Sequence, residues 1–383
     1  MNSTTELNKT GTPSILARGQ GGEVRLLSLD VYRGLIMVLL MLESTGFYEN
    51  MLQLTEGNWL NDFFLQFTHH PWNGLRFWDL IQPGFMFIAG TSLALSLDKQ
   101  FKAGVSWNVA FIKTIKRCWW LFFWGVLDYA VRPGGLSFEL WDVLTQLSFT
   151  TLVAFLIFQL DWKVQLSVSV ALLLLTEILY RLTNVEGFNQ PFVDQHNFGN
   201  FMDTILMNKI NEGGWVAINC LPTAAHTIWG SLVGQMLLSV WPSKKKIQIL
   251  IYAGVACLVV GFLMDGVSTP IIKRIATTSF VIASAGWCLL GLALFYWWVD
   301  VQQNKAGWKF VTIVGMNSIF IYLFFEIVAG RWFNGYAGAI GNGILSILSF
   351  PDGLMMILTP LFIFALEWGM CYFLYRKKIF FKL

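Results

Sequence analysis

The sequence predicts an all-α, polytopic integral membrane protein, and three observations carry that prediction. Hydrophobic residues make up 55% of the 383-residue chain and charged residues only 13%, about half the charged share of a soluble domain. Tryptophan and phenylalanine, which anchor and pack helices in lipid, are present in 18 and 33 copies. About ten apolar runs are long enough to cross a hydrocarbon core of roughly 30 Å. The net charge of +3, with no basic tract, argues against a nucleic-acid partner.

The chain before the first apolar run, residues 1–24, is polar and rich in Gly, Ser and Thr. It has no apolar core of the kind that signal peptides carry, so we expect a disordered cytoplasmic tail. From residue 25 to residue 383 we expect one transmembrane domain. Its predicted spans are 30–49, 79–97, 117–132, 143–160, 164–181, 214–241, 247–264, 278–299, 308–329 and 354–375. The Gly-rich apolar stretch 337–350 fits either a re-entrant or interfacial segment or an eleventh span.

The distribution of lysine and arginine predicts the orientation, because these residues gather in cytoplasmic loops. With the N-terminus inside, the cytoplasmic segments hold most of the 26 lysines and arginines, and both termini are cytoplasmic. Two long loops, near 50–78 and 182–213, then face the opposite side, and the basic stretch 98–117 is the one long cytoplasmic loop. The lack of a targeting segment favours a bacterial inner membrane.

Two adjacent histidines, of only four in the chain, lie in the first outer loop. A histidine exchanges its proton near neutral pH, so His69 is suited to act as a general base. If a helix begins just after the pair, His69 can orient against Asn73 or Asp79, and such a partner would fix its tautomer. The alternative is an ordinary interfacial loop anchored by Trp72. No third ligand follows His69 and His70 at a metal-binding spacing, so we expect no metal.

Polar side chains inside predicted spans are costly in lipid, which makes each a candidate for a binding site. Glu43 falls in the outer half of the first span and either meets a substrate or only borders an aqueous mouth. His226 and Asn317 either line a polar cavity or bond to a neighbouring helix. Arg33 follows Asp30 by three residues, on one helix face. That pair either anchors the helix end or forms a positive lip for an anionic ligand.

Several sequence blocks, in a fixed order, match a pattern that covers nearly everything after residue 25. They are Ser-Leu-Asp-Val-Tyr-Arg-Gly (28–34), His-His-Pro-Trp-Asn-Gly (69–74), Asp-Leu-Ile-Gln-Pro-Gly-Phe-Met-Phe-Ile-Ala-Gly-Thr-Ser (79–92), Asn-Phe-Gly (197–199) and Gly-Met-Asn-Ser-Ile (315–319). Taken together, they resemble a bacterial-type member of the heparan-α-glucosaminide N-acetyltransferase family, within the transmembrane acyltransferases.

The resemblance implies an enzyme that takes acetyl-CoA, as donor substrate, from the cytoplasm and acetylates the amine of an amino sugar on the periplasmic side. It maps the family's active histidine to His69, with His70 one residue away. We therefore expect three groups of site residues. The catalytic group is His69, Asp79 and Asn73; the substrate-binding group is Glu43, His70, Trp72, His226 and Asn317; the group that holds acetyl-CoA is Arg33, Lys113, Lys116 and Arg117.

The chain departs from the family pattern at three places. Glu43 stands where many members have Asn, His226 stands where Thr is expected, and the block 142–147 lacks the usual Arg. The acceptor pocket and part of the CoA contact are therefore expected to differ. A transporter or sensor of sugars on the same scaffold is the chief alternative, and a structural membrane protein is a weaker one. The expected partners are lipid and a small amino sugar, and a homodimer is left open.

Overall fold

The computed structural model describes residues 17–18, 24–132 and 136–381 and is all-α apart from a two-residue ladder between β1 (Ala17–Arg18) and β2 (Val24–Arg25). The expected disordered tail, 1–24, lies almost entirely outside the described residues. The first helices are α1 (Leu27–Ser44), α2 (Phe47–Leu54), α3 (Trp59–Leu65), η1 (Phe77–Leu80), α4 (Ile81–Lys102), α5 (Trp107–Ala130), α6 (Val143–Ile157), α7 (Trp162–Leu182) and α8 (Phe198–Met207). The later ones are η2 (Ala217–Asn219), α9 (Cys220–Leu238), α10 (Ser243–Val267), α11 (Thr278–Phe295), η3 (Tyr296–Val301), α12 (Lys309–Gly315), α13 (Ser318–Leu323), η4 (Phe324–Phe333), α14 (Asn334–Ile347) and α15 (Asp352–Arg376).

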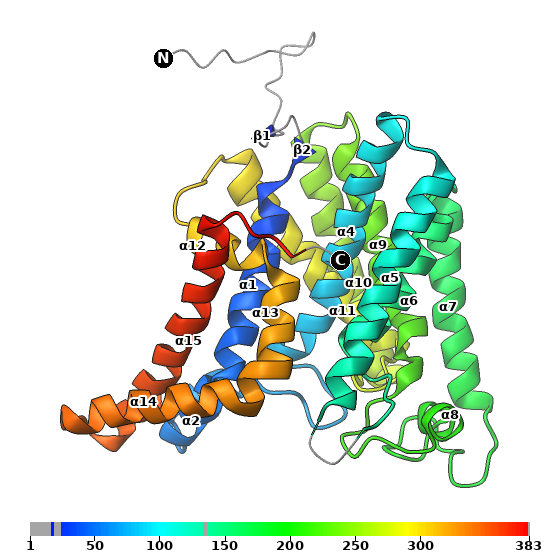
Figure 1. The fold of residues 1–383 in the computed structure, drawn as a ribbon. Helices are drawn as coiled ribbons and strands as arrows, with labels where there is room; N and C mark the ends of the chain where they lie inside the picture. Colours follow the sequence, from blue (N-terminus) through cyan, green and yellow to red (C-terminus); the bar gives the residue numbers. More distant parts are fainter. Residues whose placement is uncertain (1–16, 19–23, 133–135, 382–383) are drawn as a thin grey trace, which may run out of the picture.

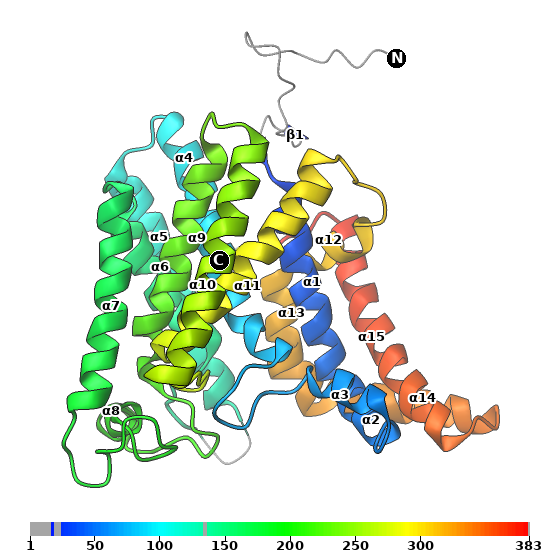
Figure 2. The same cartoon turned by 180° about the vertical axis from the view of Figure 1, so that it is seen from behind.

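The long helices stand side by side in one bundle, and α2, α3 and α8 gather with the loops at the end opposite the start of α1 (Figures 1 and 2). In the described part of the chain, five helical segments are long and apolar enough to cross a membrane, and the bent pair of α12 with α13–α14 would be a sixth. Helices of this length and apolar composition are those of an integral membrane protein. The neighbouring α1, α5, α6 and α9 are shorter or carry more polar groups. Those same helices carry six of the twelve candidate site residues, and the total of ten spans stays a prediction.

Three predicted segments differ in detail from the structure. The prediction of a long loop at 98–117 is wrong, because α4 extends to Lys102 and α5 already begins at Trp107. Long basic side chains can reach water from a helix end, so their charge does not mark where a helix stops. The span at 308–329 is broken after Met316, with a bend of 75°. The stretch at 337–350 forms α14, which lies across the outer end of the bundle at a steep angle to α15 (Figure 1).

The closest packing in the bundle joins α4 to α9. Gly90 of α4 lies against the backbone of Thr227, and Gly230 of α9 lies against the backbone of Phe87. A Cβ atom at either glycine would overlap a carbonyl oxygen of the facing helix. Small residues at such contacts let two helix backbones approach closely, which is how helices associate where lipid removes the hydrophobic driving force. The α4–α9 pair therefore forms one wall of the bundle.

The variant Gly230→Ala is expected to destabilise the folded protein by about 1–3 kcal/mol or more, because its methyl group cannot be placed without separating α4 from α9. Gly369→Ala in α15 is the matched control, since a Cβ atom there meets nothing within 4 Å and alanine favours a helix by up to about 1 kcal/mol. Thermal unfolding in detergent, followed by size-exclusion chromatography, measures both. Equal midpoints for the two variants would contradict the proposed contact.

Candidate active site

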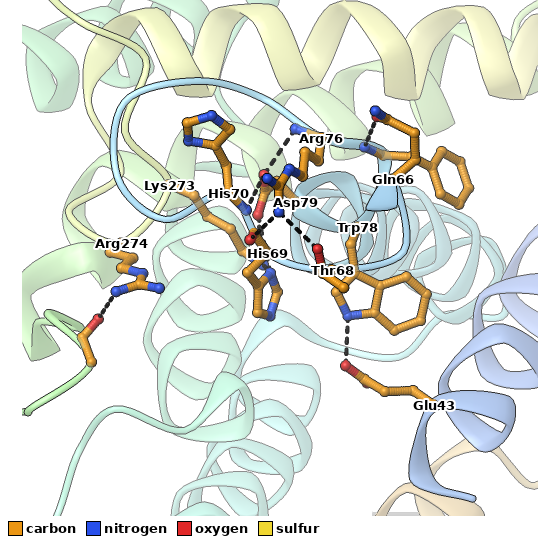
Figure 3. Close-up of polar contacts among 12 residues, drawn as sticks. Glu43, Gln66, Thr68, His69, His70, Arg76, Trp78, Asp79, Lys273 and Arg274 are labelled. Atoms are coloured by element: carbon orange, nitrogen blue, oxygen red, sulfur yellow. Dashed lines mark hydrogen bonds and ion pairs between the residues drawn. The ribbon is translucent and has the colours of Figure 1, made fainter. Parts of the chain in front are cut away.

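His69 lies in the loop between α3 and η1, paired with a buried carboxylate. Its Nδ1 atom is 3.0 Å from Oδ1 of Asp79, and only 1% of the Asp79 side chain is exposed. The other oxygen, Oδ2, accepts hydrogen bonds from the backbone N–H groups of Arg76 at 2.9 Å and His70 at 3.3 Å. Figure 3 shows Asp79 between these groups. The expected pairing of His69 with Asp79 is thus present, and the carboxylate is held in one orientation.

The loop that carries His69 is shaped by three local contacts. The guanidinium of Arg76 donates to the carbonyl oxygen of His69 at 2.9 Å and to Oγ1 of Thr68 at 2.7 Å. The N–H of Gly74 donates to the carbonyl oxygen of Ile271 at 2.8 Å, and its φ of +147° is one that side chains rarely adopt. A Cβ atom there would also overlap the ring of His70. The loop is therefore fixed against the segment that joins α10 to α11.

Asn73 does not join His69 in the part of the chain that the structure describes. Its backbone forms an isolated bridge with Ile272, and its side chain is exposed. Trp72 donates from Nε1 to the carbonyl oxygen of Phe192 at 2.7 Å and packs among the buried residues of the outer loops. These contacts give Asn73 and Trp72 a role in holding the loop.

Lys273, in the α10–α11 loop, is a site residue that the sequence did not reveal. Its Nζ atom lies 3.0 Å from Nδ1 of His69 and 3.7 Å from Oδ1 of Asp79, and it lies 5.1 Å from the ring centre of Trp215. Burial lowers the pKa of Lys273 to about 8, against the opposing effect of Asp79. Burial also lowers the pKa of His69, and the Lys273 charge adds to this while Asp79 works against it. His69 is therefore neutral at pH 7.

Glu43 borders the same outer region from the end of α1. Its Oε1 atom accepts a hydrogen bond of 2.7 Å from Nε1 of the buried Trp78, next to Asp79 in η1. Figure 3 shows Glu43 on the side of Trp78 that faces away from Arg76. The Glu43 residue is exposed, so a second carboxylate is available near His69. Among the described residues, no group of three or more His, Cys, Asp or Glu side chains could hold a metal ion.

A cavity of about 670 Å³ lies toward the opposite end of the bundle, where α1 begins. Two arginines from different helices line it, Arg33 of α1 and Arg117 of α5. Arg33 donates to Oγ of Ser92 at 2.6 Å, whereas Arg117 has no hydrogen-bond or ion-pair partner among the described residues. Lys113 and Lys116, on the exposed side of α5, are not in the lining. The remaining lining residues are Asp30, Met37, Phe85, Ile88, Ala89, Ser96, Leu121, Val143, Leu144, Leu147, Gly315, Met316, Ser318, Ile319, Tyr322, Phe380 and Phe381.

A polar layer separates this cavity from His69. Nε2 of Gln82 donates to Oε1 of Gln146 at 2.6 Å, and the hydroxyl of Tyr322 donates to Oδ2 of Asp142 at 3.0 Å. Gln82 lies between Asp79 and the cavity-lining Phe85 along one helical path. At 1.5 Å per residue, these six positions span roughly 9 Å. The two parts of the site are thus close along α4 but not continuous.

Two predicted binding residues lie elsewhere. Nε2 of His226 contacts Oγ of Ser284 at 2.9 Å, so His226 joins α9 to α11. The Asn317 amide donates to the carbonyl oxygen of Ile379 at 3.1 Å and accepts from the N–H of Phe381 at 3.0 Å. Asn317 thereby holds the C-terminal segment across the edge of the cavity. For His226 the structure shows the helix-bonding alternative that the sequence left open, whereas Asn317 bonds to the C-terminal segment beyond α15 and not to a helix.

Comparison with known proteins gives two partial matches. The chain is 31% identical over 149 residues to heparan-alpha-glucosaminide N-acetyltransferase of Mus musculus. This match covers 36% of the present chain and 20% of the mouse protein. It is 32% identical over 82 residues to the Homo sapiens protein of the same name, covering 21% of this chain and 10% of the human protein. The chain thus matches a fifth or less of the length of either relative. No family model matches it. The matches support a relationship to an acetyltransferase over part of the chain.

Proposed function

We propose that this chain is a membrane-embedded N-acetyltransferase that uses acetyl-CoA from the cytoplasm and acetylates a glucosamine-like amino sugar on the periplasmic side of a bacterial inner membrane. Both termini would then be cytoplasmic, and no metal is required. One observation carries the proposal most directly. His69 is paired with a buried carboxylate at one end of the bundle, and a cavity with two arginines opens toward the other.

The arginine-lined cavity supports the donor side of the proposal. An arginine without a protein partner in a partly buried cavity is costly unless an anion meets it, and guanidinium groups bind phosphate oxygens with particular strength. Acetyl-CoA carries such phosphates. The volume of the cavity, about 670 Å³, falls within the range of small-molecule sites. Arg33 and Arg117 are therefore the residues that we propose for the donor phosphates.

The chemistry of the outer end supports the acceptor side. An amino sugar is an ammonium ion at pH 7 and must lose a proton before its nitrogen can attack. We propose that Nε2 of His69 takes that proton, while Glu43 attracts the ammonium group. The amine nitrogen then bonds to the thioester carbon, the carbon–sulfur bond breaks, and the CoA thiolate leaves with the second proton of the amine. The Gln82–Gln146 layer must open for the acetyl group to reach this point.

Acceptor-dependent release of free CoA tests the proposal. Purified protein is incubated with acetyl-CoA and with amino sugars, beginning with glucosamine, and the new thiol is followed. N-acetylglucosamine, which has no free amine, is the matched control. Release of CoA with glucosamine but not with N-acetylglucosamine supports the transferase. Binding of sugars without CoA release from any acceptor would favour a transporter or sensor on the same scaffold.

The pH profile provides a second test of the base. Because the pKa of His69 lies below the 6.5 of an ordinary histidine, the ring becomes protonated, and loses its free electron pair, only below that pH. In the proposed mechanism the acceptor binds as an ammonium ion and gives its proton to His69, so kcat/KM requires the neutral ring. We therefore expect log kcat/KM to fall by one unit per pH unit as the pH drops through the pKa of His69, which lies below its ordinary value of 6.5. The same fall in His69→Ala would contradict a basic role for His69.

A further inference from the structure

Two groups compete for one nitrogen of His69. Nδ1 lies 3.0 Å from Oδ1 of Asp79 and also 3.0 Å from Nζ of Lys273. A carboxylate can only accept a hydrogen bond and an ammonium group can only donate one, whereas a neutral imidazole carries a single N–H. If Nδ1 donates to Asp79, Nε2 keeps its electron pair. If Lys273 donates to Nδ1, the ring proton must sit on Nε2.

We propose that Lys273 is a positioning residue whose charge selects the tautomer of His69, so that loss of its proton releases Nε2 to act as a base. The charged ammonium donates to Nδ1 and holds the ring in its Nε2–H form. A neutral Lys273 no longer favours that form. The ring proton then lies on Nδ1, which donates a hydrogen bond to the fixed oxygen of Asp79. The inference rests on the proposed function for its catalytic consequence, but the tautomer itself does not depend on any substrate.

The surroundings allow Lys273 to change its charge in the working range of pH. Only 6% of its side chain is exposed, and burial lowers its pKa to about 8. The neighbouring Arg274 also lowers that pKa, whereas Asp79 and Glu43 raise it. Arg76 contacts the backbone of His69 and keeps the loop in place. Roughly one Lys273 in ten is then neutral at pH 7, so both tautomers are accessible.

Nuclear magnetic resonance on the full chain in detergent, with ¹⁵N-labelled histidine and no substrate, tests the tautomer directly. The His69 signals are identified by their loss in His69→Ala. We expect the Nε2–H form at pH 7 and a change to the Nδ1–H form with a midpoint near pH 8. In Lys273→Met we expect the Nδ1–H form wherever the ring is neutral. One unchanged tautomer in the wild-type protein from pH 7 to pH 9.5 would overturn the proposal.

Kinetics supply a ranking that a merely structural lysine would not produce. Lys273→Arg keeps the positive charge but cannot lose it, so His69 would stay in the Nε2–H form. Lys273→Met removes the competing donor. At pH 7 we expect kcat/KM of Lys273→Met to exceed that of Lys273→Arg by at least about tenfold. A purely structural role for the lysine predicts the reverse order, and observing that order would overturn the proposal. Because the tautomer is measured without an acceptor, the change of tautomer with pH remains a separate result even if no acetyl transfer is found.

Discussion

Replacing His69 by alanine is expected to lower kcat for acetyl transfer by about a hundred- to ten-thousand-fold, the usual contribution of a positioned general base. The reason lies in the pairing of His69 with Asp79, whose second oxygen is occupied by two backbone N–H groups. Initial rates of glucosamine-dependent CoA release measure the effect. Binding of acetyl-CoA should change little, because the cavity lies roughly 9 Å further along α4.

The matched control for this variant is His196→Ala. His196 is also an outer-loop histidine, but it is exposed, and its Nδ1 atom lies 3.0 Å from the carbonyl oxygen of Gly187 rather than from a carboxylate. Wild-type turnover is expected for His196→Ala, and a milder loss for His70→Ala, whose ring packs on Gly74. If His69→Ala were fully active and His70→Ala inactive, the base would be the neighbouring histidine. Full activity in both would remove the pair from the mechanism.

Replacing Arg117 by alanine is expected to weaken acetyl-CoA binding by roughly ten- to a hundred-fold. A hydrogen bond to a charged group contributes about 1.5–3 kcal/mol, and each 1.4 kcal/mol is about a tenfold change in Kd. Arg117 lines the cavity and has no hydrogen-bond or ion-pair partner in the described chain, so its removal breaks no polar contact there. Isothermal titration of the detergent-solubilised protein with acetyl-CoA measures the change.

Lys116→Ala is the matched control for the donor site. Lys116 precedes Arg117 in α5, carries the same charge and lies on the exposed side, outside the cavity. Its removal is expected to leave the affinity within about twofold at ordinary ionic strength, since exposed charges are screened. Equal affinities for wild type and Arg117→Ala would exclude Arg117 from the donor site. A large loss in Lys116→Ala would instead show that the phosphates bind at the surface of α5.

The sequence indicated those parts of the site that depend on local spacing. Asp79 follows His69 by ten residues, and a short helix start brings it back to the loop. The class of fold followed from composition and pattern together, because charged residues make up only 13% of the chain, about half the share of a soluble domain, and the apolar residues fall in long runs. Helix ends were less predictable. The basic residues of α5 look like a loop in the sequence, yet their long side chains reach water from within a helix.

Long-range contacts explain what sequence reasoning missed. Lys273 meets His69 across 204 positions of the chain, and nothing in the residues around it marks that partner. Likewise, Asn317 was grouped with the binding residues, but it meets the C-terminal segment 62 positions later. A polar residue inside a span signals that a partner exists, and only the fold shows which one.

The glycine contact between α4 and α9 has a consequence for the dynamics of the site. Amide hydrogens exchange with solvent only when their helix opens locally, and tightly packed elements open least. The amides of α4 and α9 are therefore expected to be among the most protected in the chain, and those of α14, which lies across the outer end with many exposed residues, among the least. Asp79 is joined directly to the start of α4. The partner of His69 thus belongs to a slowly exchanging core, and its geometry persists while the periphery opens and closes.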